Sequence, residues 1–393
     1  MKKDNVSSQR SSRTWLTSDS CDLEDFKREI SRTTRAEDYP HAARIEQNVP
    51  IYDGADILKT AATVEGRNAV MAEWAEVMLT GPGIVVFTNT SMDMQALDRA
   101  TIIFQEIIAE QHATKSGGGD HFAKPGANDR IWNALEKLAL RDPDCFARYY
   151  CNDLIAMVSQ CWLGQGYQIT SQLNVVNPGG EAQSVHRDYH MGFQTTAQIA
   201  TFPAHAHALS PMLTLQGAIA HIDMPIESGP TLYLPFSQTY HPGYFAWRKP
   251  EFKEFFTKNY VQLPLKKGDM AFLNPALFHA AGHNTSTDIK RMANLLQVSS
   301  AYGRAMETVD RTAMAKKLYP VLASAGMNAK QIANVIAASA EGYSFPTNLD
   351  RDPPIGGLAP ETPAGLMHKA LKETMSLADF SASLDASDKR KLS

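Results

Sequence analysis

The spacing of hydrophobic residues along this chain changes near Gly166. Before that point apolar residues recur at the three-to-four-residue interval of amphipathic helices. A short apolar run, Ile84–Phe87, follows the Gly81-Pro82-Gly83 turn and predicts a buried strand. We therefore expect a first region of helices with one early strand, the helices covering 68–78, 92–112 and one or two segments within 131–163.

After Gly166 apolar and polar residues alternate, which is the period of a half-buried strand. Turn residues such as Asn177-Pro178-Gly179-Gly180 and Lys267-Gly268-Asp269 divide this region into short pieces. Many short strands at this spacing indicate a sandwich or barrel. The predicted strands are 167–176, 183–190, 212–221, 230–234, 261–264, 270–273 and 291–299.

Helical spacing returns after Tyr302, over 313–322 and 329–338. The sequence thus predicts a mixed α/β (α+β) fold, with a β core flanked by helices. We expect an N-terminal extension over 1–60, a core domain with a helical lead-in over 61–305, and a C-terminal helical extension over 306–393.

Composition and charge narrow the class of protein. Of 393 residues, 44% are hydrophobic and 20% charged, which is typical of a globular chain and excludes disorder over most of its length. The net charge of −4 argues against broad binding to nucleic acid or to an anionic membrane. No apolar run reaches 18 residues, and the basic start lacks the apolar stretch of a secretory signal. Four cysteines without metal-site spacing favour free thiols in a reducing cytoplasm.

The segment Ser184-Val185-His186-Arg187-Asp188-Tyr189-His190 carries the first candidate chemistry. His186 and Asp188 are two residues apart, so in a strand an imidazole and a carboxylate project from the same face. Two such ligands and a histidine from elsewhere would form a site of two histidines and one carboxylate. That site leaves open positions for a bidentate cosubstrate and for oxygen on ferrous iron.

A second segment, Gly268–His279, runs from a turn into an apolar stretch and ends on a histidine. Twelve residues later Arg291 opens a strand, with Ala293 and Leu295 on its own face, which predicts a partly enclosed guanidinium. A guanidinium near a metal-binding histidine can hold a dicarboxylate through paired hydrogen bonds, while a 2-oxo acid group chelates the metal.

With these residues in order, the chain resembles the phytanoyl-CoA dioxygenase family of iron(II)- and 2-oxoglutarate-dependent oxygenases. The resemblance rests on His186-x-Asp188, on His279 followed by Gly282-x-Asn284-Thr285-Ser286, and on Arg291. Gly83–Phe87 is similar to the opening strand of the family, and the stretch from His221 to Gln238 is similar to its "D…ENG…VIPGSH" motif. The resemblance covers roughly residues 80–300 and implies a double-stranded β-helix, a jelly-roll core of the cupin type.

The resemblance also implies roles for individual residues. His186, Asp188 and His279 would bind Fe(II), and Arg291 would hold the distal carboxylate of 2-oxoglutarate. Further candidates for contact with the cosubstrate are Gln172, Asn174 and Gln216, the last at a position where the family often has Trp. Candidate substrate or lid residues are His190 and Lys124, the latter corresponding to a lysine that some relatives place near the cosubstrate.

Some features depart from the family pattern. The family often has a small hydroxyl residue two positions after the distal histidine, where this chain has Ala281. The segment Tyr189–Pro211 is long enough to form a substrate loop or lid, in which we expect His205 and His207 to be solvated. His283, four residues after His279, should point away from the metal.

The predicted activity is oxidation of an unactivated C–H bond of a small-molecule metabolite by Fe(II), 2-oxoglutarate and O2, with release of succinate and CO2. Two alternatives stay open. One is a cupin-like zinc hydrolase or isomerase using the same ligands, since zinc also accepts two histidines and a carboxylate. The other is a non-catalytic β-barrel binding protein. The expected partner is the substrate alone, or a second copy of the chain in a homo-oligomer.

Overall fold

The structure is a computed structural model that describes residues 11–114, 126–181, 183–344 and 347–392. Its chain contacts separate into two compact units. Unit 1 comprises Met1–Thr90, Gly118–Asp129 and Asn174–Asn294, and unit 2 comprises Ser91–Gly117, Arg130–Leu173 and Leu295–Ser393. Strands β5 (Gln168–Val176) and β11 (Arg291–Ser299) each contribute residues to both units.

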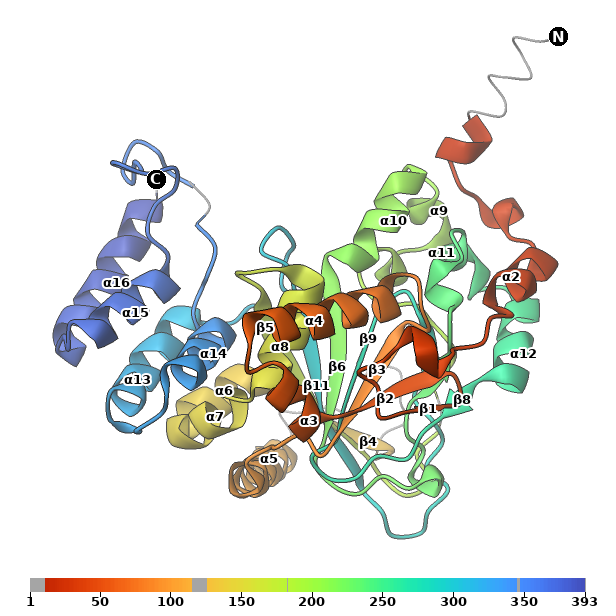
Figure 1. Cartoon of the computed structure of the whole chain (residues 1–393), viewed down its shortest axis with the longest axis horizontal. Helices are drawn as coiled ribbons and strands as arrows, with labels where there is room; N and C mark the ends of the chain where they lie inside the picture. Colours follow the sequence, from red (N-terminus) through yellow and green to blue (C-terminus); the bar gives the residue numbers. More distant parts are fainter. Residues whose placement is uncertain (1–10, 115–125, 182, 345–346, 393) are drawn as a thin grey trace. The chain divides into compact units, whose positions relative to one another are not determined.

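An eight-stranded sheet runs through the β core (Figure 1), in the order β1-β2-β3-β9-β6-β11-β5-β4. Strands β2 and β3 are parallel, whereas β3 and β6 both pair antiparallel with β9. Besides β5 and β11, the strands of this sheet are β1 (Arg44–Glu46), β2 (Val49–Asp53), β3 (Ile84–Thr88), β4 (Asn128–Ile131), β6 (Thr214–Ala220) and β9 (Met270–Leu273).

A second sheet of three antiparallel strands has the order β10-β7-β8, formed by Phe278–Ala280, Leu232–Leu234 and Val261–Gln262. From β5 onward the chain passes back and forth between the two sheets, which is the arrangement of a double-stranded β-helix. The predicted mixed fold with a jelly-roll core is therefore confirmed.

The two faces of the small sheet pack against different layers. One apolar cluster contains Tyr233 of β7 together with residues of the large sheet, among them Ile51, Val86 and Leu273, so this face looks toward the large sheet. The other cluster places Leu232, Leu234, Phe278 and Ala280 against the aromatic residues Phe26, Tyr240, Phe252 and Phe256. Alternation along β7 and β10 thus gives each strand an inner and an outer set of side chains.

The helices of unit 1 frame this core. Thr63 accepts a hydrogen bond from the backbone N–H of Gly66, which caps the start of α4. Gly83, at a φ of +84°, ends the turn before β3, where a Cβ atom would meet the side chains of Gln238 and Leu277. These helices are α2 (Leu23–Ile30), α3 (Gly54–Thr60), α4 (Val64–Leu79), α9 (Thr196–Ile199), α10 (Ala204–Met212), α11 (Gly243–Ala246) and α12 (Pro250–Asn259).

Unit 2 is largely helical. The predicted segment 131–163 contains three helices, because Asp142 and Asn152 each cap a new one, and the later predictions correspond to α13 and α14. Its helices are α5 (Met94–Thr114), α6 (Ala134–Arg141), α7 (Pro143–Tyr150), α8 (Asp153–Leu163), α13 (Arg311–Ser324), α14 (Ala329–Ser339), α15 (Pro363–Lys372) and α16 (Leu377–Lys391).

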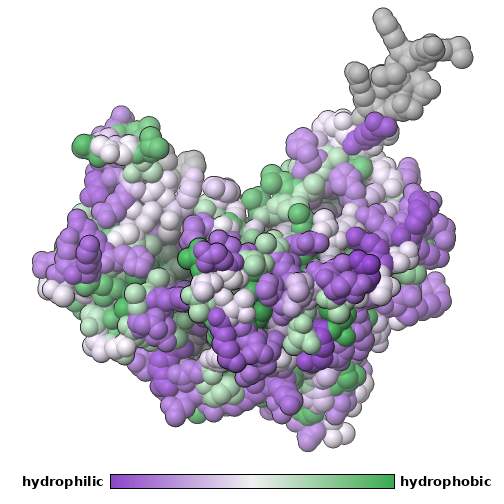
Figure 2. Space-filling view, in the orientation of Figure 1, coloured by the Kyte–Doolittle hydropathy of each residue, from purple (hydrophilic) through white to green (hydrophobic). Residues whose placement is uncertain are grey.

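Two local predictions need revision. Residues 183–190 form an isolated bridge at His186 rather than a continuous strand. The expected loop 189–211 contains the short helical turn η3 (His190–Phe193), α9 and α10. Figure 2 shows hydrophobic side chains gathered over α10, where Leu209 is 52% exposed.

Candidate metal centre

His186 and His279 lie directly opposite each other across a two-strand bridge. The His186 N–H donates to the His279 carbonyl at 3.0 Å, and the His279 N–H returns a bond to the His186 carbonyl at 3.3 Å. The two rings therefore leave the same side of the pair, and their centroids are 4.5 Å apart. Asp188, two residues beyond His186, joins them, and the three side chains bring ligand atoms within 4.8 Å of one another. Side chains far apart in sequence thus converge on one point of unit 1.

Backbone carbonyls set the orientation of both imidazoles. His186 Nδ1 lies 2.9 Å from the Ser184 carbonyl, and His279 Nδ1 lies 2.8 Å from the Leu277 carbonyl. A carbonyl can only accept, so each Nδ1 carries a proton and each Nε2 is the atom directed toward Asp188. The Nε2 atoms lie 3.6 Å and 3.4 Å from the two oxygens of Asp188. This is the arrangement by which proteins prepare histidines for a metal.

The carboxyl group of Asp188 is held in its ionised form. Its burial opposes ionisation, but the electrostatic and hydrogen-bond interactions with His186 and His279 keep its pKa well below the ordinary value. The Gln216 side-chain amide, on β6, donates to Asp188 Oδ2. With the Nε2 protons released to solvent on metal binding, two imidazoles and one carboxylate form a donor set that suits a divalent transition metal with open coordination positions.

Arg291, the first residue of β11, is a buried cation in the same unit, only 7% exposed. Its Nη1 donates to the Gly282 carbonyl at 3.4 Å, and the described part of the chain provides no carboxylate that pairs with it. Burial lowers its pKa to about 10, so the guanidinium stays charged at neutral pH. A buried guanidinium whose N–H groups are only partly hydrogen-bonded is stabilised when an anion binds beside it.

Tyr233 is a site residue that the sequence analysis did not identify. It pairs in register with His279 across β7 and β10, so both side chains face the large sheet. Burial raises the pKa of its phenol to about 12, and Arg291 is the neighbouring charge that opposes this rise. The neutral phenol therefore lies within the field of the guanidinium. Only the strand register reveals this placement, because Tyr233 stands between two leucines in the sequence.

The candidates on β5 lie in different surroundings. Gln172 is fully buried in unit 2, and its amide nitrogen lies 3.7 Å from the sulfur of Met306, with Glu307 as a further hydrogen-bond partner. Asn174, two residues along, belongs to unit 1 and has a buried Oδ1 without a partner in the described part of the chain. Asn174 can thus still accept a hydrogen bond from a ligand, while the role of Gln172 stays a prediction.

The remaining candidates fall outside the ligand cluster. His190 Nδ1 lies 3.0 Å from the Ser210 hydroxyl of α10, which ties the segment after Asp188 to that helix. The prediction for His207 is wrong: it is 2% exposed, contacts the Ile199 carbonyl and stacks on Phe245. Helix α10 buries it because residues 204–212 are helical rather than a solvated loop, and His205 on the same helix is exposed. Lys124 lies outside the described residues.

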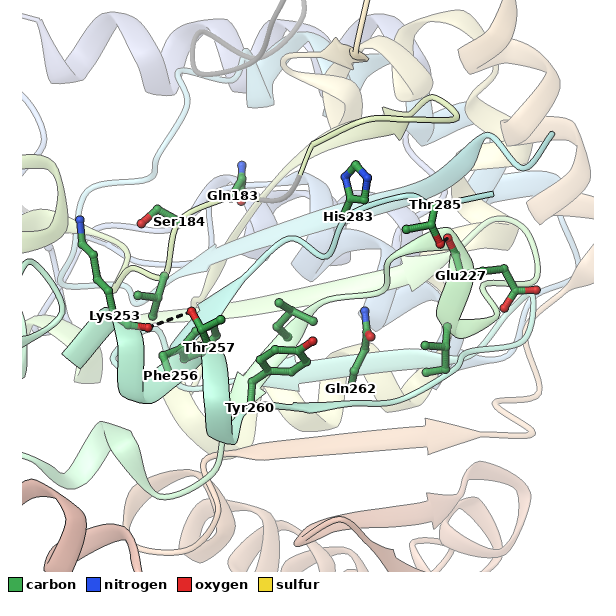
Figure 3. A pocket seen from close by; sticks show the side chains of 13 residues that line it. Gln183, Ser184, Glu227, Lys253, Phe256, Thr257, Tyr260, Gln262, His283 and Thr285 are labelled. Carbon is green, nitrogen blue, oxygen red and sulfur yellow. Dashed lines mark hydrogen bonds between the residues drawn. The ribbon is translucent and has the colours of Figure 1, made fainter. Parts of the chain in front are cut away.

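A pocket of about 630 Å³ opens on the outer side of the small sheet (Figure 3). Val185 and Leu232 line it together with Lys253, Phe256 and His283. Val185 is adjacent to His186, so its side chain leaves the opposite face of the segment. This pocket is therefore separate from the ligand cluster, and His283 points away from the metal ligands as expected.

Two further observations bear on the class of protein. All four cysteines carry free thiols, and burial raises the pKa of Cys145 and Cys161 to about 12. Within the described ranges, no helix combines the length and apolarity needed to cross a bilayer.

No curated protein matches the chain. Structural similarity is found to the α-ketoglutarate-dependent epimerase SnoN of nogalamycin biosynthesis (18% identity, 60% of this chain and 84% of that one, TM-score 0.38). Iron-bound EctD from S. alaskensis is also similar (16% identity, 59% of this chain and 78% of that one, TM-score 0.42). So is AviO1 from Streptomyces viridochromogenes Tue57 (15% identity, 60% of this chain and 97% of that one, TM-score 0.41).

The family comparison is more direct. The model of the phytanoyl-CoA dioxygenase (PhyH) family matches residues 66–292, more than half of the 393-residue chain. The matched range contains the three clustered ligands and Arg291. The chain therefore belongs to the phytanoyl-CoA dioxygenase family, which confirms the predicted class of iron(II)- and 2-oxoglutarate-dependent oxygenases.

Proposed function

We propose that this enzyme hydroxylates, or otherwise oxidises, an unactivated C–H bond of a small-molecule metabolite, releasing succinate and CO2. The observation that carries the proposal is the convergence of the His186, Asp188 and His279 side chains, with the Nδ1 atom of each imidazole held by a backbone carbonyl. Iron(II) bound by these side chains would supply oxygen activation coupled to decarboxylation of 2-oxoglutarate. The protein supplies the donor atoms, their orientation and an enclosed site.

Each ligand in this proposal has a supporting contact. His186 and His279 are oriented by the carbonyls of Ser184 and Leu277, and Gln216 holds one oxygen of Asp188. A carboxylate at position 188 fills the coordination place that a halide would need, which favours hydroxylation over halogenation.

Arg291 is proposed to bind the distal carboxylate of 2-oxoglutarate. A carboxylate would pair with a guanidinium that has no other anionic partner in the described part of the chain, through charge-assisted hydrogen bonds. The Tyr233 hydroxyl, kept neutral by burial, can donate a further bond to the same group. Asn174 and Gln172 remain proposed cosubstrate contacts, and His190 a proposed substrate or lid contact.

The proposed setting is a reducing cytoplasm, supported by the four free thiols. The substrate is proposed to be a free small molecule. Succinate release measured across a metabolite library would identify it.

The test of the function is anaerobic addition of Fe(II) and 2-oxoglutarate to metal-free protein. We expect the weak visible charge-transfer band of the chelate, and we expect His186→Ala to lose it while remaining folded by circular dichroism. Folded, metal-loaded wild-type protein without this band would overturn the proposal in favour of a zinc enzyme or a binding protein.

A further inference from the structure

Arg187 stands between two of the metal ligands, and its side chain leaves the opposite face of the segment. It is 3% exposed, whereas its neighbours His186 and Asp188 turn toward the ligand cluster. An arginine is seldom this buried unless it is paired. The described part of the chain provides no carboxylate in ion-pair contact with Arg187.

Backbone carbonyls and aromatic rings take the place of a counter-ion. Arg187 Nη2 donates to the Ser237 carbonyl at 2.5 Å and to the Tyr240 carbonyl at 3.0 Å. The guanidinium carbon lies 5.3 Å from the centre of the Tyr244 ring and 5.2 Å from that of Phe278. These distances are within the range of cation–π attraction.

Two of these neighbours lead back to the metal ligands. Phe278 immediately precedes His279 in β10. The Tyr244 hydroxyl donates to the Asp188 carbonyl at 3.3 Å. A single cation therefore contacts groups adjacent to Asp188 and to His279, and its own backbone joins His186 to Asp188.

Gly243, the first residue of α11, leaves the space that the guanidinium fills. A Cβ atom at Gly243 would lie 1.9–2.2 Å from the guanidinium atoms of Arg187. Any larger residue must displace one or the other, because real Cβ atoms do not approach other heavy atoms so closely. The guanidinium of Arg187 therefore occupies space that is available only because residue 243 has no side chain.

We propose that Arg187, seated against Gly243, is a positioning residue that fixes the His186–Asp188 segment relative to His279 before metal binds. This inference rests on the proposed function, because it assigns the metal to these three side chains. The supporting contacts of metal ligands commonly change metal affinity by 10–100-fold when removed. Replacing a buried charge with an apolar residue, in contrast, is often neutral for stability. Metal affinity and stability should therefore separate in variants of Arg187.

The experiment measures binding of Mn(II) alone to the full-length, metal-free protein, from loss of the free-ion signal in electron paramagnetic resonance. Arg187→Met should weaken Mn(II) binding by roughly 10–100-fold with little change in unfolding temperature. Arg187→Lys, which keeps the charge but loses the planar fork, should recover part of that affinity. The visible spectrum of the Co(II) protein should also change in Arg187→Met, because it reports the geometry of the ligands.

Gly243→Ala tests the contact between Arg187 and Gly243 without changing a residue of the His186–Asp188 segment. It should weaken Mn(II) binding in the same direction, since the added methyl group displaces the guanidinium. The matched control is Arg311→Met in unit 2. Arg311 also donates to two backbone carbonyls, those of Ala338 and Ile169, but it belongs to α13 and to the other unit. Arg311→Met should leave Mn(II) affinity unchanged.

Wild-type Mn(II) affinity and Co(II) spectrum in both Arg187→Met and Gly243→Ala would overturn the positioning role. So would an equal loss of affinity in Arg311→Met, which would show only that buried arginines support the fold. If Arg187→Met does not fold, Arg187→Lys and Gly243→Ala decide the question. Wild-type protein that binds Mn(II) but never consumes 2-oxoglutarate would refute the proposed function and leave this inference intact.

Discussion

Arg291 and Arg187 are buried cations of the same unit, yet their surroundings differ. Arg187 is held by two backbone carbonyls and two aromatic rings. Arg291 makes one long hydrogen bond, to the Gly282 carbonyl, and the phenol of Tyr233 is the group that interacts with it electrostatically. In both, burial lowers the pKa to about 10, so both remain charged at neutral pH.

The comparison separates a positioning cation from a binding cation. A guanidinium has five donors, and a buried one is costly until they are matched. Arg187 obtains two carbonyl acceptors and two aromatic rings from the fold itself, although its buried Nε has no partner in the described part of the chain. Arg291 keeps donors in reserve, so an anion that enters beside it gains strong hydrogen bonds. The degree of burial alone does not distinguish the two arginines, because both are almost fully buried.

The largest effect is expected at the proposed metal ligands. Asp188→Ala should abolish both Fe(II) binding and 2-oxoglutarate turnover, because two neutral imidazoles remain without a charged ligand. Equilibrium dialysis of Fe(II) and a succinate assay check this. Circular dichroism should show an intact fold, and a variant that still turns over 2-oxoglutarate would exclude Asp188 as a ligand.

Arg291→Ala should have the next largest effect, confined to the cosubstrate. Each lost charge-assisted hydrogen bond is worth about 1.5–3 kcal/mol, which corresponds to a rise of roughly 10–150-fold in the KM for 2-oxoglutarate. Steady-state kinetics at saturating Fe(II) measure it. Mn(II) affinity should not change, in contrast to Arg187→Met. An unchanged KM would show that Arg291 does not bind the cosubstrate.

Tyr233→Phe should have a smaller effect in the same direction. A neutral hydrogen bond contributes about 0.5–1.5 kcal/mol, so the KM for 2-oxoglutarate should rise by roughly 2–12-fold. The ring and its packing against Leu263 and Leu277 are kept, so the unfolding temperature should stay close to that of the wild type. A loss of stability without a change in KM would make Tyr233 a core residue only.

The sequence identified the site wherever function imposes residue type and spacing. His186-x-Asp188 needs only local alternation, and Arg291 opens a strand whose polar and apolar alternation is visible in the sequence. The family model matches residues 66–292, a range that contains these residues, while their roles stay a prediction. Strands β9 and β11 appear within the predicted ranges because their flanking turn residues mark their ends.

What the sequence could not supply depends on contacts between distant segments. Tyr233 faces His279 only through strand register, and Arg187 meets Gly243 only after α11 has packed behind the small sheet. Residues 204–212 lack the capping signals of a helix, since Pro203 makes no side-chain cap, and their burial of His207 was missed. Strands β1 and β2 were missed because the first 50 residues are polar and weakly periodic. The domain boundaries at 60 and 305 stay a prediction.

The smallest effect is expected on the outer side of the small sheet, at His283. This exposed histidine lies four residues after His279 and lines the pocket of Figure 3. His283→Ala should leave Mn(II) affinity and the KM for 2-oxoglutarate at wild-type values, because the ligands and Arg291 lie on the inner side. Mn(II) titrations of His283→Ala and of His279→Ala under the same conditions provide the comparison, because His279→Ala should lose Mn(II) binding. A marked loss of metal affinity in His283→Ala would mean that side chains on the outer side of the small sheet also take part in metal binding. The distinction drawn between Arg187 and Arg291 would then lose its structural basis.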